Sequence, residues 1–213
     1  MLGLLFAVSI PSGLPIGGQV GSPRLATADP PKFDADQLRA RFIAQFPTYL
    51  EWPKESLPER TTPLVIVTVD APTLATELRT IFERLRARAE EARKKNPERP
   101  LPRPVQVRSH SARAIIEKPE LLAGAHVVHL GKSVVGTPAR KILGMVSSAP
   151  TLTISDRVAD HPRATMIELV PAKAKFRIAI RRHLLTKAGL RASSKLLRLA
   201  ELLPDPEEQE GER

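Results

Sequence analysis

The sequence predicts an α/β fold, with one domain built on a mixed, mostly parallel sheet that ends in an antiparallel hairpin and a closing helix. Short, almost uninterrupted apolar runs rich in β-branched residues recur along the chain. Such runs are typical of strands buried on both faces of a sheet. Segments with helical spacing of apolar residues lie between these runs. Because buried strands that alternate with helices predict parallel pairing, we expect layers of the Rossmann or flavodoxin type.

In chain order, the elements expected in the first half are a helix at Asp34–Tyr49, a strand at Leu64–Val69, a helix at Thr73–Ala92 and a strand at Val105–Arg108. Pro47 should end or kink the first helix, because proline has no amide hydrogen to donate. Thr73 should cap the second helix. The second half of that helix, Arg84–Lys95, is dominated by charge. We interpret it as a solvent-exposed helix end that precedes a proline-rich connector.

The elements expected next are a helix at Ser111–Leu122, a strand at Ala125–Leu130, a helix at Thr137–Ser147 and a strand at Thr151–Ser155. Gly124 can end the first of these helices, because glycine tolerates the left-handed backbone found just beyond helix C-termini. Thr137 followed by Pro138 is the order typical of an N-cap and the first helical residue.

The last part of the domain changes character. Thr165–Val170 and Lys175–Ile180 both have extended patterns, and we expect them to form an antiparallel hairpin at one edge of the sheet. Apolar side chains of the second arm face one way and the alternating residues face the other, which predicts one solvated face. A helix at His183–Ala188, a break at Gly189 and a helix from Ser193 or Ser194 to Leu203 complete the expected domain.

The two ends of the chain are interpreted separately from the domain. Residues 1–10, MLGLLFAVSI, form an apolar run as long as a signal-peptide core, although no Lys or Arg precedes it. Ala26-Thr27-Ala28 supplies an A-x-A cleavage pattern. We expect a signal peptide at 1–28, the domain at 29–203 and an acidic flexible tail at 204–213. The apolar run is shorter than the about 20 residues of a membrane span. Together with the cleavage pattern, it predicts an exported protein.

Composition excludes several functional classes. The 213 residues include no cysteine, which excludes thiol catalysis, iron–sulfur clusters and cysteine-ligated zinc. Lys and Arg number 33 against 23 Asp and Glu, for a formal net charge of +10. Basic charge can indicate nucleic-acid binding, but aromatic residues are only 4% and no nucleic-acid-binding motif accompanies the charge. We therefore expect no nucleic-acid partner.

Few residues have the spacing of a phosphate or metal site. Gly131-Lys132-Ser133 resembles the end of a phosphate-binding loop, but the glycine required five residues earlier is His126. His126 and His129 are three residues apart, so in a strand they face opposite ways. We expect one of them to be partly buried and the other to lie at the surface. Asp156, Asp160 and His161 share a loop without the spacing of metal ligands.

Catalytic motifs are equally scarce. A Ser–His–Asp arrangement that uses Ser111, His110 or Ser155 remains open, but nothing in the sequence positions one. We expect no enzymatic activity, cofactor or metal.

Several sequence motifs, taken together, resemble those of a known protein family. Tyr49-Leu50-Glu51-Trp52-Pro53 follows the first predicted helix, Met166-Ile167 and Phe176-x-Ile178 lie in the two arms of the hairpin, and AGLRASSKLLRLA occupies residues 188–200. These motifs resemble those of the YfiR-like family, and the similarity covers about Asp34–Leu203. The family's usual Asn after Met-Ile is Glu168 here, the helix Thr73–Lys95 is longer than typical, and the cysteines of some members are absent.

The resemblance implies a periplasmic α/β protein, often a homodimer, without known catalytic residues. Its best-known members bind the periplasmic domain of a membrane-bound diguanylate cyclase and hold down cyclic di-GMP synthesis, which connects them with biofilm regulation. Related domains are sensor regions attached to histidine kinases. The alternative expectation is therefore a periplasmic small-molecule-binding sensor domain that works with a histidine kinase or another receptor.

Candidate contact residues gather near the C-terminus. Leu196, Leu199 and Leu203 are expected to face the sheet, which leaves Leu190 and Leu197 beside Arg191, Lys195 and Arg198 as a partner or dimer surface. Arg177, Arg181 and Arg182 are expected to line the solvated side and end of the hairpin, either to bind an acidic patch or small anion or to guard an edge strand. The motif residues interpreted as structural are Trp52, Pro53, Met166, Ile167, Phe176, Gly189, Ser193 and Ser194.

Overall fold

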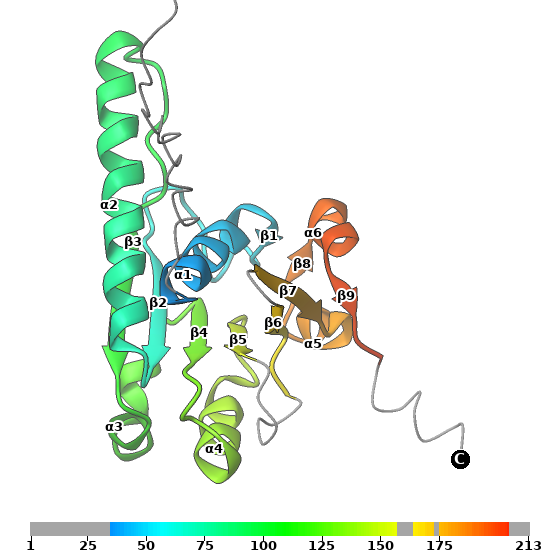
Figure 1. The fold of residues 1–213 in the computed structure, drawn as a ribbon. Coiled ribbons are helices and arrows are strands. Elements are labelled where there is room, and N and C mark those ends of the chain that lie inside the picture. Colours follow the sequence, from blue (N-terminus) through cyan, green and yellow to red (C-terminus); the bar gives the residue numbers. More distant parts are fainter. Residues whose placement is uncertain (1–34, 157–163, 173–174, 205–213) are drawn as a thin grey trace, which may run out of the picture. The chain divides into compact units, whose positions relative to one another are not determined.

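The computed structural model describes residues 35–156, 164–172 and 175–204. Within these residues, seven strands form one sheet in the order β3-β2-β4-β5-β6-β7-β9 (Figure 1). They are β2 (Leu64–Val69), β3 (Val105–His110), β4 (Val127–Leu130), β5 (Leu152–Asp156), β6 (Ile167–Ala172), β7 (Lys175–Ile180) and β9 (Glu201–Leu202). The strands from β3 to β6 pair in parallel, and β6 and β7 form the antiparallel hairpin. The predicted mixed, mostly parallel sheet is confirmed.

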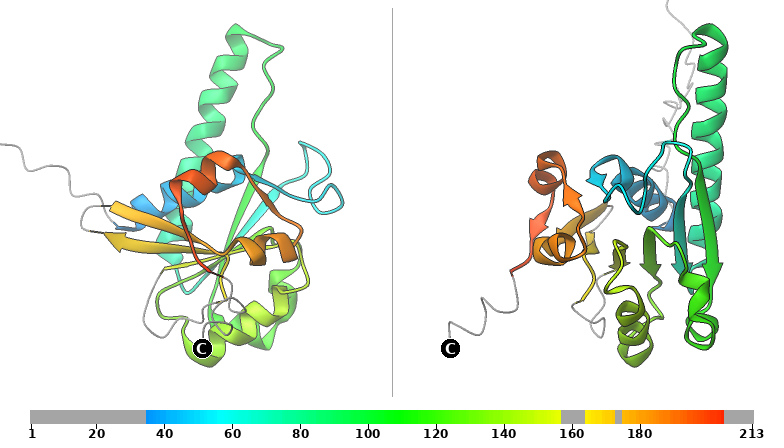
Figure 2. Two further views of the ribbon diagram at one scale, coloured as in Figure 1. Left: turned by 90° about the vertical axis from the view of Figure 1, so that its right-hand side faces the viewer. Right: turned by 180° about the vertical axis from the view of Figure 1, so that it is seen from behind.

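Helices cover both faces of the sheet (Figure 2). One face carries α1 (Ala35–Gln45) and α2 (Pro72–Lys95), and the other carries α3 (Ala112–Glu117) and α4 (Gly136–Val146). Two short C-terminal helices, α5 (Arg182–Lys187) and α6 (Ser194–Leu199), pack Leu185 and Leu196 into the same core as α1 and α2. The three layers place the sheet between two apolar cores.

The helices match the expected positions, with differences at their ends. Neither Thr73 nor Thr137 is an N-cap, because α2 starts at Pro72 and α4 at Gly136, one residue before each threonine. Ser111 does cap α3, since its Oγ accepts the Ala114 amide hydrogen at 3.1 Å. The helix predicted at Ser111–Leu122 is divided into α3 and a 3₁₀ turn, η2 (Pro119–Leu122), because proline interrupts the helical hydrogen-bond ladder. A second 3₁₀ turn, η1 (Phe46–Thr48), contains Pro47 and ends the first helix.

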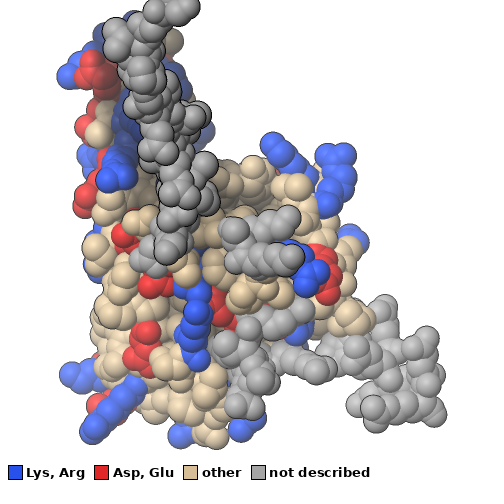
Figure 3. Space-filling model, in the orientation of Figure 1, with Lys and Arg blue, Asp and Glu red and all other residues tan. Residues whose placement is uncertain are grey.

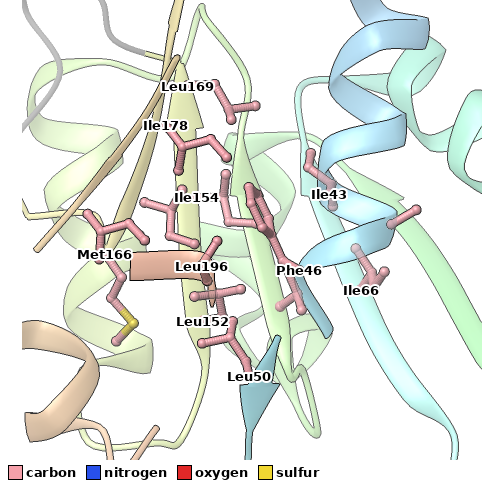
Figure 4. Packing of buried hydrophobic residues seen from close by; sticks show 14 of the residues in the cluster. Ile43, Phe46, Leu50, Ile66, Leu152, Ile154, Met166, Leu169, Ile178 and Leu196 are labelled. Carbon is pink, nitrogen blue, oxygen red and sulfur yellow. The ribbon is translucent and has the colours of Figure 1, made fainter. Parts of the chain in front are cut away.

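The central strand β2 is buried on both faces, as its sequence predicted. Leu64 and Ile66 belong to the core under α1 and α2, whereas Val65, Val67 and Val69 belong to the core under α3 and α4. Figure 4 shows the first core, where Ile43 of α1, Ile154 of β5 and Leu196 of α6 converge with the other labelled side chains. The continuous apolar run is therefore required because both faces of β2 are in contact with a core.

The strand order reverses between β2 and β4. The chain passes from β2 to β3 on one side and then crosses to β4 on the other side of β2. The loop after β2 leads to α2 on one face, and the loop after β4 leads to α4 on the opposite face. Gly131 begins the second loop and donates its amide hydrogen to the Val69 carbonyl oxygen at 2.8 Å. The two loops are thus in direct backbone contact at their bases.

The C-terminus differs from the expectation. The last helix ends at Leu199 rather than Leu203, because Ala200 is extended with ψ of 151°. Glu201–Leu202 then pairs in parallel with β7, so the hairpin lies inside the sheet and β9 forms its edge. A separate two-stranded antiparallel sheet joins β1 (Leu50–Glu51) to β8 (Arg191–Ala192).

Glycine substitutions test the contact between the two loops. A Cβ at Gly131 would lie 2.7 Å from the backbone oxygens of both Val69 and Asp70, whereas a Cβ at Gly144 on α4 meets nothing within 4 Å. We expect Gly131→Ala to lower the free energy of unfolding by about 1–3 kcal/mol through overpacking. We expect Gly144→Ala to raise it by about 0.5–1 kcal/mol, because alanine favours a helix. Urea unfolding followed by circular dichroism measures both, and a Gly131→Ala variant as stable as the parent would contradict this account.

Candidate functional site

The structure brings the two most distant family-type motifs into one small sheet. Leu50 pairs with Ala192, Glu51 pairs with Arg191, and the Ser193 amide donates to the Tyr49 carbonyl oxygen at 2.8 Å. The side chain of Ser193 also caps α6, since its Oγ accepts the Leu196 amide hydrogen at 3.3 Å. The segment before Trp52 and the closing segment therefore hold each other in place.

The remaining motif residues lie in or against the core under α1 and α2. Met166 and Ile167 are buried, and Trp52 packs against the same cluster from its edge. The Phe176 ring meets Phe42 edge to face at 6.4 Å, and the Arg39 guanidinium lies 5.1 Å from its centroid. Gly189 has φ of +71°, and a Cβ there would come within 3.3 Å of the Pro53 ring. These contacts give Trp52, Pro53, Met166, Ile167, Phe176 and Gly189 packing roles, whereas Ser193 and Ser194 are exposed.

The candidate partner surface needs two corrections. Leu190 is buried, with 2% of its surface exposed, because the left-handed turn at Gly189 directs it into the core. Leu199, expected to face the sheet, is 66% exposed, and Leu202 is 52% exposed. Leu199 is the last residue of α6, and the extended residues of β9, which include Leu202, no longer follow the helical stripe.

The corrected surface combines cations with exposed leucines. Arg191, Lys195 and Arg198 are exposed, Leu197 is half-buried, and Lys195 lies over the Tyr49 ring at 5.6 Å. Lys and Arg side chains gather over α6 on the face shown in Figure 3. On α6, Lys195, Arg198 and Leu199 share one side because they are three and four residues apart. The residues Arg191, Lys195, Arg198, Leu199 and Leu202 are called the C-terminal surface below.

The hairpin does not have the predicted solvated face along its whole length. Arg177 and Arg182 are exposed, but Arg181 is 7% exposed. Arg181 donates to Glu168 at 2.5 Å and to the Thr165 carbonyl oxygen at 2.9 Å. Glu168, the residue that departs from the family-type motif, thus has its countercharge directly after the end of the neighbouring strand β7. The pair makes Arg181 part of a buried polar cluster rather than a surface for a partner.

His126, which precedes β4, and His129 within β4 are both buried, so the expectation of one surface histidine was wrong. His126 accepts the Val65 amide hydrogen at Nδ1, 3.1 Å away, and its Nε2 lies 3.0 Å from the Ser56 carbonyl oxygen, to which it donates. This ring ties a loop to the sheet. Asp160 and His161 lie outside the described residues. Among the residues that are described, no group of His, Asp and Glu has the geometry of a metal site.

A crevice opens at the carboxyl ends of the central strands, where the strand order reverses. Its volume is about 340 Å³. It is lined by Asp36, Arg39, Asp70, Ala71, Pro72, Thr73, Leu74, His129, Gly131, Lys132, Ser133 and Asp156. The sequence reasoning noted Lys132, Ser133 and Asp156 but missed Asp36, Arg39 and Asp70. Asp70 directly follows a buried strand, which is the signal that could have found it.

A buried ion pair forms one wall of this crevice. The Arg39 Nε of α1 donates to the Asp156 carboxylate at 2.8 Å, and the two side chains are 5% and 2% exposed. Arg39 also binds Asp36, one turn earlier on the same helix. On the other wall, the Asp70 carboxylate accepts the Ala112 amide hydrogen at 3.2 Å. Each acidic side chain that lines the crevice therefore has an ion pair or a hydrogen bond within the protein.

Comparison with known proteins assigns the chain to a family. A family model described as YfiR/HmsC-like matches residues 36–201, and the chain belongs to this family. Members are periplasmic and regulatory rather than catalytic. No curated protein matches the chain significantly. None of the helices in the described residues combines the length and apolar character that a bilayer crossing requires.

Replacing Arg39 tests the buried ion pair. We expect Arg39→Met to lower the free energy of unfolding by about 3–5 kcal/mol, because it removes the principal countercharge of a buried carboxylate. The matched control is Arg86→Met on α2, whose ion pair with Glu90 is 69% and 48% exposed. Such exposed pairs contribute about 0–1 kcal/mol. Equal losses in the two variants, measured by urea unfolding, would contradict the assignment of a buried ion pair.

Proposed function

We propose that this protein is an exported, non-enzymatic regulator that binds the periplasmic part of a membrane signalling enzyme. Family membership supports this, because the members are periplasmic and regulatory. The partner we infer is a membrane-bound diguanylate cyclase, whose repression lowers cyclic di-GMP inside the cell and changes biofilm regulation. Residues 1–28 act as the signal peptide in this proposal, 29–203 as the regulatory domain and 204–213 as an acidic tail.

The observation that carries the proposal is the C-terminal surface. Leu199 and Leu202 are two of the four large apolar side chains that are exposed within the described residues. Leu199 shares one side of α6 with Lys195 and Arg198. Among the described residues, Arg191, Lys195 and Arg198 are exposed and form no ion pair. Apolar side chains next to arginine are typical of protein–protein contact surfaces. The surface therefore suits a partner that presents apolar and acidic side chains.

In the proposed mechanism, the regulator represses the cyclase by remaining bound to it. A regulator that binds the inactive arrangement of the cyclase more tightly than the active one shifts the population toward the inactive arrangement. Release of the regulator reverses this shift. The same C-terminal surface is our candidate for the homodimer contact, so a dimer built on it would compete with partner binding.

Substitutions on the C-terminal surface test the proposal. Binding of the purified protein to the periplasmic domains of the host's membrane diguanylate cyclases is measured by biolayer interferometry. We expect one domain to bind, and Leu199→Asp or the double variant Lys195→Glu with Arg198→Glu to weaken binding about ten-fold or more, as loss of a central contact does. These side chains are exposed, so the variants should remain folded.

The control is Lys141→Glu, a charge reversal at another exposed residue, on α4. It should bind like the parent. Binding to no cyclase domain would overturn the proposed partner. Parental affinity in both surface variants would overturn the proposed surface.

A further inference from the structure

The crevice at the reversal of strand order has no role in the proposed partner contact. In an open parallel sheet the loops on either side of such a reversal lead to opposite faces, and ligands bind in the crevice between them. Here those loops are the ones that follow β2 and β4, and they lead to α2 and α4 in opposite layers. The volume of about 340 Å³ falls within the about 300–1,000 Å³ typical of small-molecule sites.

The loop after β4 supplies polar groups at the mouth of the crevice. Lys132 and Ser133 are exposed and line it, and Gly131 holds their loop against the backbone of Val69 and Asp70. Within the described part of the chain, Lys132 forms no ion pair. The short Gly-Lys-Ser sequence lacks the first glycine of a phosphate-binding loop, as its sequence showed. It nevertheless places an ammonium group and a hydroxyl at this crevice.

The opposite wall also favours a negative charge. The first turn of α2 supplies Pro72, Thr73 and Leu74 to the lining, and no side chain among the described residues caps it. The amide groups and dipole at the start of a helix stabilise nearby anions. Arg39 pairs with both Asp36 and Asp156, so its single positive charge offsets one of these two lining carboxylates, and Lys132 brings a second positive charge to the crevice.

Asp70 gives the crevice a second kind of group. Its carboxylate accepts one amide hydrogen bond from Ala112 and borders the crevice at the end of β2. A carboxylate accepts up to about four hydrogen bonds, so it can also accept from ligand hydroxyls. The crevice therefore offers donors at Lys132 and Ser133 and an acceptor at Asp70.

We propose that this crevice binds a small hydroxylated organic anion. Lys132, Ser133 and the first turn of α2 hold its carboxylate or phosphate group, and Asp70 accepts hydrogen bonds from its hydroxyls. The inference concerns the isolated protein and does not depend on the cyclase partner, so its failure and the failure of the proposed function are separate results.

Nuclear magnetic resonance titration of the ¹⁵N-labelled protein tests the proposal. The probes are malate with succinate as its deoxy control, and glycerol 3-phosphate with inorganic phosphate as the control without carbon-bound hydroxyls. We expect saturable shifts of the Thr73, Leu74, Lys132 and Ser133 amides with malate or glycerol 3-phosphate. The probe that binds more tightly distinguishes a carboxylate from a phosphate ligand, and each deoxy or inorganic control should bind more weakly.

Lys132→Gln should weaken binding about ten-fold or more, because a charged hydrogen bond is lost. Lys141→Gln on α4 is the matched control and should bind like the parent. Absence of saturable shifts at these four amides with all four probes would overturn the site. Equal weakening by the two variants would also overturn it, and succinate or phosphate binding as tightly as its hydroxylated counterpart would overturn the ligand class.

Discussion

Strand β2 has an apolar core on each of its faces, with Leu64 and Ile66 on one side and Val65, Val67 and Val69 on the other. A strand buried in this way needs helices on both sides of the sheet, and the chain supplies them by moving first to β3 and then across to β4. The helices that follow β2 and β4 consequently belong to opposite layers. The crevice opens where their loops separate, so its place in the molecule follows from the arrangement of the two cores.

The parallel part of the fold could be predicted because its strands are specified locally. Leu64–Val69 is a continuous run of β-branched and apolar residues, and β2 has the same bounds. The C-terminal end could not be predicted in the same way, because the leucine spacing of α6 continues through Leu203 although the helix stops at Leu199. Glu201–Leu202 becomes a strand only through its pairing with β7. The burial of Arg181 likewise depends on Glu168 of the neighbouring strand, which alternation along one strand does not show.

The same distinction between local and long-range signals applies to the candidate sites. Exposure of Arg191, Lys195 and Arg198 could be anticipated from the closing motif, whereas the exposure of Leu199 and Leu202 required the observed end of α6. In the crevice, Asp70 and Lys132 follow buried strands, so the sequence alone could have predicted that both lie at the carboxyl edge of the sheet. Arg39 meets Asp156 across 117 residues of sequence, and nothing in either segment indicates that contact. The apolar residues of the family-type motifs, by contrast, lie in packed positions.

In the proposed function, this protein represses a cyclase from the periplasmic side of the membrane. The most direct measurement is intracellular cyclic di-GMP in the native host with and without the gene. We expect cyclic di-GMP to rise on deletion, and we expect the complete gene, but not a gene without residues 1–28, to reverse the rise. Unchanged cyclic di-GMP on deletion, or full reversal by the protein that lacks residues 1–28, would contradict repression from the periplasm.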